Sequence, residues 1–100
     1  MSVAQAQRNV NALDTDIANL EKKKVAKDKE CADLQKKIVA AQKSASKTSS
    51  QTTLKNKLRQ IASWEADLAK KSKDSADIGK KIADKKKKRA DKYDFLCEPW

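Results

Sequence analysis

The chain has very few residues that break helices. Its 100 residues include one glycine, Gly79, and one proline, Pro99. A glycine inside a helix costs about 1 kcal/mol and a proline about 3 kcal/mol, so their absence over long stretches favours uninterrupted helices. The one stretch dense in residues that end helices is the Ser/Thr-rich run at residues 44–53. The sequence therefore predicts two long helices joined by one turn.

Histidine is absent, and there are two cysteines, Cys31 and Cys97. Histidine is the usual general base and the commonest metal ligand. Two cysteines so far apart do not form a zinc site without further ligands. Every carboxylate has lysines nearby in a helical repeat, which is typical of a solvated helix face. We therefore expect no catalytic residue, no metal and no cofactor.

Large apolar residues are also scarce. Leu, Ile, Val and Phe together number 17, and the formal net charge is +10, a combination typical of disordered chains. In contrast, Ala, Glu, Lys, Leu and Arg make up half of the chain, which is typical of a coiled coil if the apolar residues have helical spacing. The spacing of the apolar residues therefore decides between disorder and a coiled coil.

The apolar residues recur in alternating steps of three and four, as the a and d residues of a heptad coiled coil do. Lys24 and Lys27 interrupt this series in the first half of the chain, and Ser72 and Ser75 dilute it in the second. The spacing favours a coiled coil over disorder. The predicted coiled-coil seam consists of Val10, Leu13, Ile17, Leu20, Cys31, Leu34, Ile38, Leu54, Leu58, Ile61, Leu68, Ile78 and Ile82.

The Ser/Thr-rich run divides the chain. Ser50 or Thr52 is a suitable N-cap for the second helix, because a hydroxyl there accepts a hydrogen bond from an otherwise unsatisfied backbone amide. We expect a first helix at residues 1–43, the turn at 44–53, a second helix at 54–93 and an irregular C-terminal tail at 94–100.

A turn centred near Thr48 folds the chain back on itself, so the predicted fold class is all-α, a long antiparallel helical hairpin. In this register Leu58 lies opposite Ile38, and Cys31 lies near Glu65. The polar middle of one helix then faces the polar middle of the other. This agreement favours a hairpin over one continuous rod.

Two helices, each roughly 60 Å long at 1.5 Å per residue, bury only a narrow stripe between them. That stripe is too small for comfortable stability as a monomer. We therefore expect homo-oligomerisation, most simply a dimer of hairpins that forms a four-helix bundle. Trp64 is expected on the flank of the seam, as a satellite packing residue or as a contact to another subunit.

The cysteines are expected to stay reduced. Cys31 lies on the predicted seam and is expected to be a small core residue, far from Cys97 in the hairpin, so no intramolecular disulfide is expected. The four residues that begin at Cys97 lack the aliphatic pair of a prenylation motif. The sequence has no signal peptide and no apolar run of membrane-spanning length. We therefore expect a cytoplasmic chain.

The strongest candidate for a binding site is a basic run, which could hold nucleic acid, acidic lipid or an acidic partner. Asp84 and Asp91 flank the run, and no aromatic residues are interleaved to stack on bases. A solvated helix face is the alternative interpretation. This candidate anion patch consists of Lys85, Lys86, Lys87, Lys88 and Arg89.

Three segments resemble the N-terminal helical region of bacterial TIR-domain proteins, and the likeness extends over about residues 10–93. The segments are 16–23, 46–61 and 76–82; the most specific motif, Thr-Leu-Lys-x-Lys-Leu-Arg-Gln-Ile, ends the second. In that family a Lys-rich coiled coil supports self-association, and a C-terminal TIR domain cleaves NAD or makes cyclic ADP-ribose signals. This chain ends instead in residues 93–100 and contains no TIR catalytic machinery, so no NAD-cleaving activity is expected of it.

The predicted coiled-coil seam and the resemblance to TIR-domain proteins together predict a non-enzymatic oligomerisation or scaffold coiled coil. Its expected partner is a second copy of itself, together with a TIR domain in a full-length relative. The alternative is a basic helical protein that binds nucleic acid or another anionic surface weakly and without sequence preference.

Overall fold

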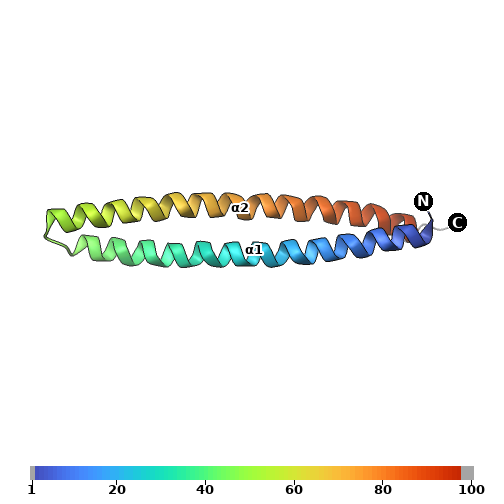
Figure 1. Ribbon diagram of the computed structural model, residues 1–100, viewed down its shortest axis with the longest axis horizontal. Helices are drawn as coiled ribbons and strands as arrows, with labels where there is room; N and C mark the ends of the chain where they lie inside the picture. The colour runs from blue at the N-terminus through green and yellow to red at the C-terminus, as the bar shows by residue number, and fades with distance from the viewer. Residues whose placement is uncertain (1, 98–100) are drawn as a thin grey trace. The chain divides into compact units, whose positions relative to one another are not determined.

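The computed structural model describes residues 2–97, and the side chains of residues 2–93. It contains two helices, α1 (Val3–Ser46) and α2 (Gln51–Cys97), joined by residues 47–50 (Figure 1). Among the described residues there is no strand. The fold is an all-α helical hairpin, which confirms the fold class predicted from the scarcity of glycine and proline.

Serine hydroxyls cap the start of both helices. At α1, the Gln5 amide donates to Ser2 Oγ at 3.1 Å. At α2, the Thr53 amide donates to Ser50 Oγ at 3.4 Å, while the Leu54 amide donates to the Ser50 carbonyl at 2.9 Å. Each hydroxyl satisfies one of the backbone donors that a helix start leaves without an intrahelical partner. Of the two N-cap candidates for the second helix, the structure uses Ser50.

The helices are longer than the sequence suggested. The connection covers residues 47–50 rather than 44–53, and α2 continues to Cys97 rather than ending at residue 93. Serine is tolerated in a terminal helical turn when its hydroxyl bonds to the backbone, and Ser46 Oγ donates to the Lys43 carbonyl at 2.7 Å. The expected irregular tail is therefore helical over residues 94–97, and residues 98–100 lie outside the described part of the chain.

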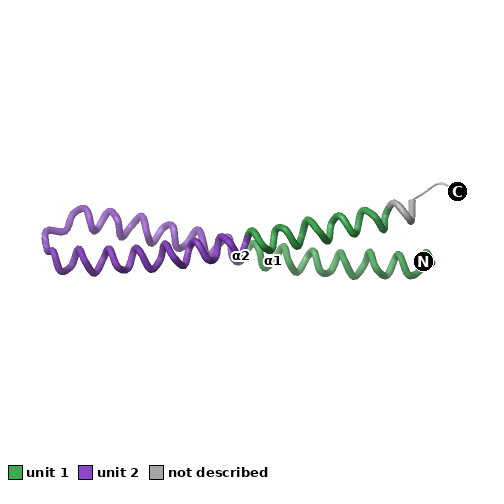
Figure 2. Tube along the Cα trace, turned by 90° about the horizontal axis from the view of Figure 1, so that it is seen from above, with its two compact units in different colours: residues 1–25, 76–100 green, residues 26–75 purple. Residues whose placement is uncertain are grey.

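The hairpin divides into two compact units, coloured separately in Figure 2. Unit 1 combines residues 1–25 with 76–100, and unit 2 consists of residues 26–75. Each unit pairs one segment of α1 with one segment of α2, running in opposite directions. The buried apolar side chains of unit 1 are Ala6, Val10, Ile17 and Ile82. Those of unit 2 are Leu34, Ile38, Ala45 and Ile61.

One predicted seam residue of α2 lies outside the seam. Leu58, expected in the seam, is 52% exposed, whereas Lys57 and Trp64 are half-buried. The Lys57 stem can cover the seam because its ammonium reaches outward to Ser44 Oγ at 2.6 Å. The seam series of α2, in steps of three and four, is Leu54, Lys57, Ile61, Trp64, Leu68, Lys71 and Ser75 in unit 2, then Ile78, Ile82, Lys85, Arg89 and Lys92 in unit 1.

Gly79 is the one glycine of the chain, and it lies inside α2. A methyl group at this position would lie 3.5 Å from Lys24 Cε, an ordinary van der Waals distance to a flexible side chain. Its backbone angle φ is not positive. Neither packing nor backbone conformation therefore requires glycine here.

Candidate functional site: the seam between the helices

The predicted seam residues divide by exposure. The structure leaves Leu58 exposed. It buries six of the others, namely Val10, Ile17, Leu34, Ile38, Ile61 and Ile82. It half-buries the remaining six, namely Leu13, Leu20, Cys31, Leu54, Leu68 and Ile78.

In unit 2, the neighbour of Cys31 lies seven residues further along α2 than expected. Cys31 Sγ lies 3.7 Å from Ser72 Oγ, whereas the sequence placed Cys31 near Glu65. Seven residues are one heptad, and a slip of one heptad brings the same face of α2 back to the seam. The apolar pattern is therefore equally compatible with both registers. Short polar side chains such as Cys31 and Ser72 mark the register that the structure adopts.

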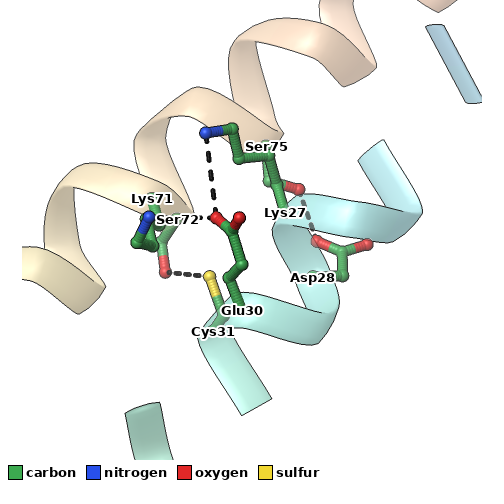
Figure 3. Close-up of polar contacts among 7 residues, drawn as sticks. All are labelled: Lys27, Asp28, Glu30, Cys31, Lys71, Ser72 and Ser75. Carbon is green, nitrogen blue, oxygen red and sulfur yellow. Dashed lines mark hydrogen bonds and ion pairs between the residues drawn. The ribbon is translucent and has the colours of Figure 1, made fainter. Parts of the chain in front are cut away.

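A polar cluster replaces apolar layers in the seam of unit 2 (Figure 3). Its deepest contact is a hydrogen bond of 2.5 Å from Ser75 Oγ to Asp28 Oδ1, and only 6% of Ser75 is exposed. A buried hydroxyl costs free energy unless it is hydrogen-bonded. Asp28, at the edge of the seam, supplies the acceptor that makes a serine tolerable at this depth.

In the same cluster, Glu30 of α1 forms an ion pair with Lys71 of α2. Its Oε2 accepts a hydrogen bond of 2.9 Å from Lys71 Nζ and lies 3.8 Å from Lys27 Nζ (Figure 3). The hydrogen bond and the charge of Lys71 lower the pKa of Glu30 below its ordinary value of 4.5. The same pair raises the pKa of Lys71 above its ordinary value of 10.5. Both shifts favour the charged forms, so the pair stabilises the folded seam.

The basic run of unit 1 faces acidic residues of α1. Arg89 Nη1 lies 2.9 Å from Asp14 Oδ1, and Lys85 Nζ lies 3.3 Å from Asp16 Oδ2. A third, longer ion pair of 3.7 Å joins Lys86 Nζ to Glu21 Oε1. Three residues of the candidate anion patch thus pair with carboxylates of α1, and Lys86, Lys87 and Lys88 are exposed.

Cations at seam positions share one arrangement in both units. Lys57, Lys71, Lys85 and Arg89 occupy the seam series of α2, and each head group reaches an oxygen at the flank of α1. Long basic side chains can bury their stems while their charges stay near water. Sequence reasoning missed these acceptors, because an acid on α1 can be matched to a cation on α2 only when the register is known.

The described residues offer no feature of a metal centre and no membrane-spanning helix. No group of three or more Cys, Asp or Glu side chains in that part of the chain is placed to hold a metal ion. No helix within it combines the length and the apolar character needed to cross a bilayer. No protein-family model, curated protein or solved structure matches this chain.

Proposed function

We propose that the chain is a cytoplasmic, non-enzymatic oligomerisation module, a helical hairpin that associates with further copies of itself. The observation that carries this proposal is the exposure of large apolar side chains on a folded hairpin with few of them. Exposed apolar side chains mark an interaction site where they gather on one surface, as Val39 and Leu58 do on one side of unit 2. The exposed residues, with their exposed fractions, are Val25 (67%), Val3 (59%), Leu58 (52%), Val39 (49%) and Tyr93 (43%).

The composition of the seam supports the same proposal. Lysine, serine or arginine occupies many seam positions, so a single hairpin buries little apolar surface of its own. Burial contributes roughly 25 cal/mol per Å² of apolar surface. Association that covers the remaining apolar residues would add to the stability of each hairpin.

We further propose that the module belongs beside a TIR domain, as the resemblance of residues 10–93 to the N-terminal region of bacterial TIR-domain proteins suggests. In such a protein the coil would hold TIR domains close together, and its contribution would be effective concentration rather than chemistry. The motif at residues 53–61 and the antiparallel coil geometry support this assignment.

Binding of nucleic acid or another anionic surface has less support. Lys85 and Arg89 pair with carboxylates of α1, and Lys86 pairs with Glu21 while staying exposed, as Lys87 and Lys88 are. We expect weak binding that falls steeply with salt. Fluorescence anisotropy with a labelled oligonucleotide at physiological salt tests this alternative, and sub-micromolar affinity would favour it over self-association.

Size-exclusion chromatography with light scattering tests the proposed function directly. The purified chain is expected to have the mass of a dimer or a larger assembly at micromolar concentration, with a strongly helical far-UV spectrum. A helical monomer that persists at several hundred micromolar would refute the proposal.

A further inference from the structure

We propose that two copies of the chain associate through one side of unit 2, here called the docking face; this inference rests on the self-association proposed above. The docking face lies beside the seam and draws on both helices. All its residues are exposed. It consists of Ala32, Gln35, Val39 and Gln42 on α1, with Leu58, Ala62, Glu65 and Ala69 on α2.

Two contacts locate this face. Ser75 of α2 and Cys31 of α1 are seam residues. Each has a polar neighbour on the opposite helix that is exposed: Asp28 bonds to Ser75, and Ser72 lies beside Cys31. Asp28 and Ser72 therefore flank the seam on the same side. In a coiled coil, steps of seven residues return to the same side. The flanking row therefore continues from Asp28 to Gln35 and Gln42 on α1, and from Ser72 back to Glu65 and Leu58 on α2.

A second row lies further from the seam on each helix. Residues three or four positions apart are neighbours on a helix surface. Ala32 and Val39 therefore adjoin the flanking row on α1, and Ala62 and Ala69 adjoin it on α2. The two rows of each helix make one continuous surface on this side of unit 2.

The composition of the docking face is unlike the rest of the chain. Glu65 is its one charged residue of eight, whereas 38% of the whole chain is charged, and the charged residues Asp28 and Lys55 continue its rows at their ends. Val39 and Leu58, both about half exposed, project from it as the large apolar side chains. Alanine rows let another helix approach closely, because the distance between packed helices depends on the side chains at the contact. Depletion of charge around a few large apolar residues is typical of the centre of an interface.

A groove on α1 overlaps the docking face. It is lined by Ala32, Gln35, Lys36, Val39, Ala40 and Lys43, and its volume is about 520 Å³. Three of these residues belong to the docking face, and the two lysines form its rim. The groove is shallow and open to solvent, and an apolar side chain such as leucine can lie against it. Leu58 of a second copy is the residue that this arrangement fits.

Charge identifies the occupant as a second copy rather than an acidic protein. Glu65 on α2 and the rim lysines Lys36 and Lys43 on α1 have opposite signs. In a two-fold contact whose axis runs along the helices, α1 of one copy faces α2 of the other, which brings Glu65 of each copy toward the lysine rim of the other. An acidic partner would instead place its carboxylates against Glu65. The docking face is therefore complementary to itself.

Lysine substitutions within the docking face test this inference. The double variant Val39→Lys, Leu58→Lys places charge at its two large apolar residues and keeps good helix formers. Sedimentation velocity is expected to show a dimer dissociation constant at least about tenfold higher than that of the unchanged chain. The matched control Ala26→Lys, Ser63→Lys adds the same charge at exposed positions of unit 2 away from the docking face, and is expected to dimerise normally.

Charge exchange supplies a second measurement that does not depend on the apolar residues. A Glu65→Lys chain and a Lys36→Glu, Lys43→Glu chain should each self-associate weakly, and their mixture should form heterodimers at least about tenfold more tightly than either alone. Native mass spectrometry reports the species. A Lys37→Glu, Lys70→Glu chain has the same net charge as the second chain, with its changes elsewhere on unit 2. It is expected to show no such preference.

The outcomes separate the two proposals. If the unchanged chain dimerises and both lysine variants dimerise equally well, the docking face is wrong while self-association stands. If the unchanged chain is a monomer throughout, self-association and the docking face are both refuted. If Val39→Lys, Leu58→Lys loses its helical spectrum, the charge-exchange mixture decides, and absence of heterodimer preference there overturns the inference.

Discussion

Ser75 and Asp28 form a hydrogen bond of 2.5 Å across the seam of unit 2, and Ser75 is the buried polar residue among the side chains that the structure describes. Apolar residues usually take this position in a coiled coil, and polar ones there specify register at a cost in stability. A slip of α2 by one heptad would keep the apolar pattern but separate Ser75 from Asp28. The hydrogen bond therefore favours one register over its nearest competitor.

Replacing Ser75 with alanine is expected to lower the free energy of unfolding by about 1 kcal/mol relative to the same change at Ser63, because both changes gain the helix propensity of alanine and only the first loses the hydrogen bond to Asp28. Urea unfolding followed by circular dichroism measures the change. Ser63→Ala is the matched control on an exposed part of α2, where substitutions usually change stability by less than about 0.5 kcal/mol. Equal effects at the two positions would contradict a structural role for the hydrogen bond.

The Glu30–Lys71 pair predicts a pH dependence. The pKa of Glu30 is lower in the folded chain than in the unfolded chain, so the pair stabilises the fold above the ordinary pKa of 4.5. This contribution is lost as the pH falls through the folded value. The stability difference between the unchanged chain and Glu30→Gln should therefore be present at neutral pH and vanish in acid.

Thermal unfolding of both proteins from pH 7 to pH 2 gives this difference directly, and separates it from the general charge repulsion of a chain with net charge +10. Because the pKa of Lys71 is raised, its part of the pair persists up to the alkaline range and is lost only above the ordinary value of 10.5. Asp33→Asn, at an exposed position, is the control. A Glu30 difference that is unchanged at pH 2 would count against the pair.

The residues of the basic run are predicted to contribute unequally to the stability of unit 1. Arg89→Gln removes the 2.9 Å pair with Asp14 and should lower the free energy of unfolding by about 0.5 kcal/mol, more at low ionic strength because salt screens exposed charges. Lys87→Gln removes an exposed charge of the same sign and should have little effect. Melting temperatures of both variants at low and high salt provide the comparison. A larger loss at Lys87 would show that the run serves another purpose.

The seam of unit 1 is predicted to control assembly in a full-length relative that has a TIR domain. Ile17 is 4% exposed and Leu20 is half-buried, so lysine at both positions introduces charges into the seam at a cost of several kcal/mol. Because unfolding of unit 1 weakens the hairpin that carries the docking face, the double variant should associate less tightly, and TIR catalysis that depends on neighbouring domains should fall with it. Fusion to a heterologous dimerising zipper should restore part of the activity. An oligomeric, fully active double variant would show that the coil is only a spacer.

The helices and their antiparallel pairing were predictable from the sequence, because Gly and Pro scarcity and the Ser/Thr run act locally on the backbone. The exact ends of the helices were harder to predict, since Ser44 and Ser46 are compatible with a helix once their surroundings fix them. Local chemistry also identified Ser50 as a candidate cap.

The register, and the seam position between Leu54 and Ile61, were not predictable from apolar residues alone. Heptad spacing repeats every seven residues, so it could not distinguish Ser72 from Glu65 as the neighbour of Cys31. The same sparseness made Leu58 look like a seam residue, although Lys57 takes that place. The ion pairs of Glu30, Asp14 and Asp16 follow from the register, and so were equally hidden.

Gly79 gives α2 a place where the helix opens more readily. A glycine residue gains more backbone freedom on leaving a helix than alanine does, by about 1 kcal/mol, and the space beside Gly79 would accept the methyl group of alanine. Local opening is therefore about fivefold more frequent here than it would be with alanine, since 1 kcal/mol corresponds to about that factor. Backbone amides around Gly79 should exchange with solvent deuterium sooner than those in the turns on either side. Transient opening in α2 thus has a preferred starting point, which α1, with no glycine, does not share.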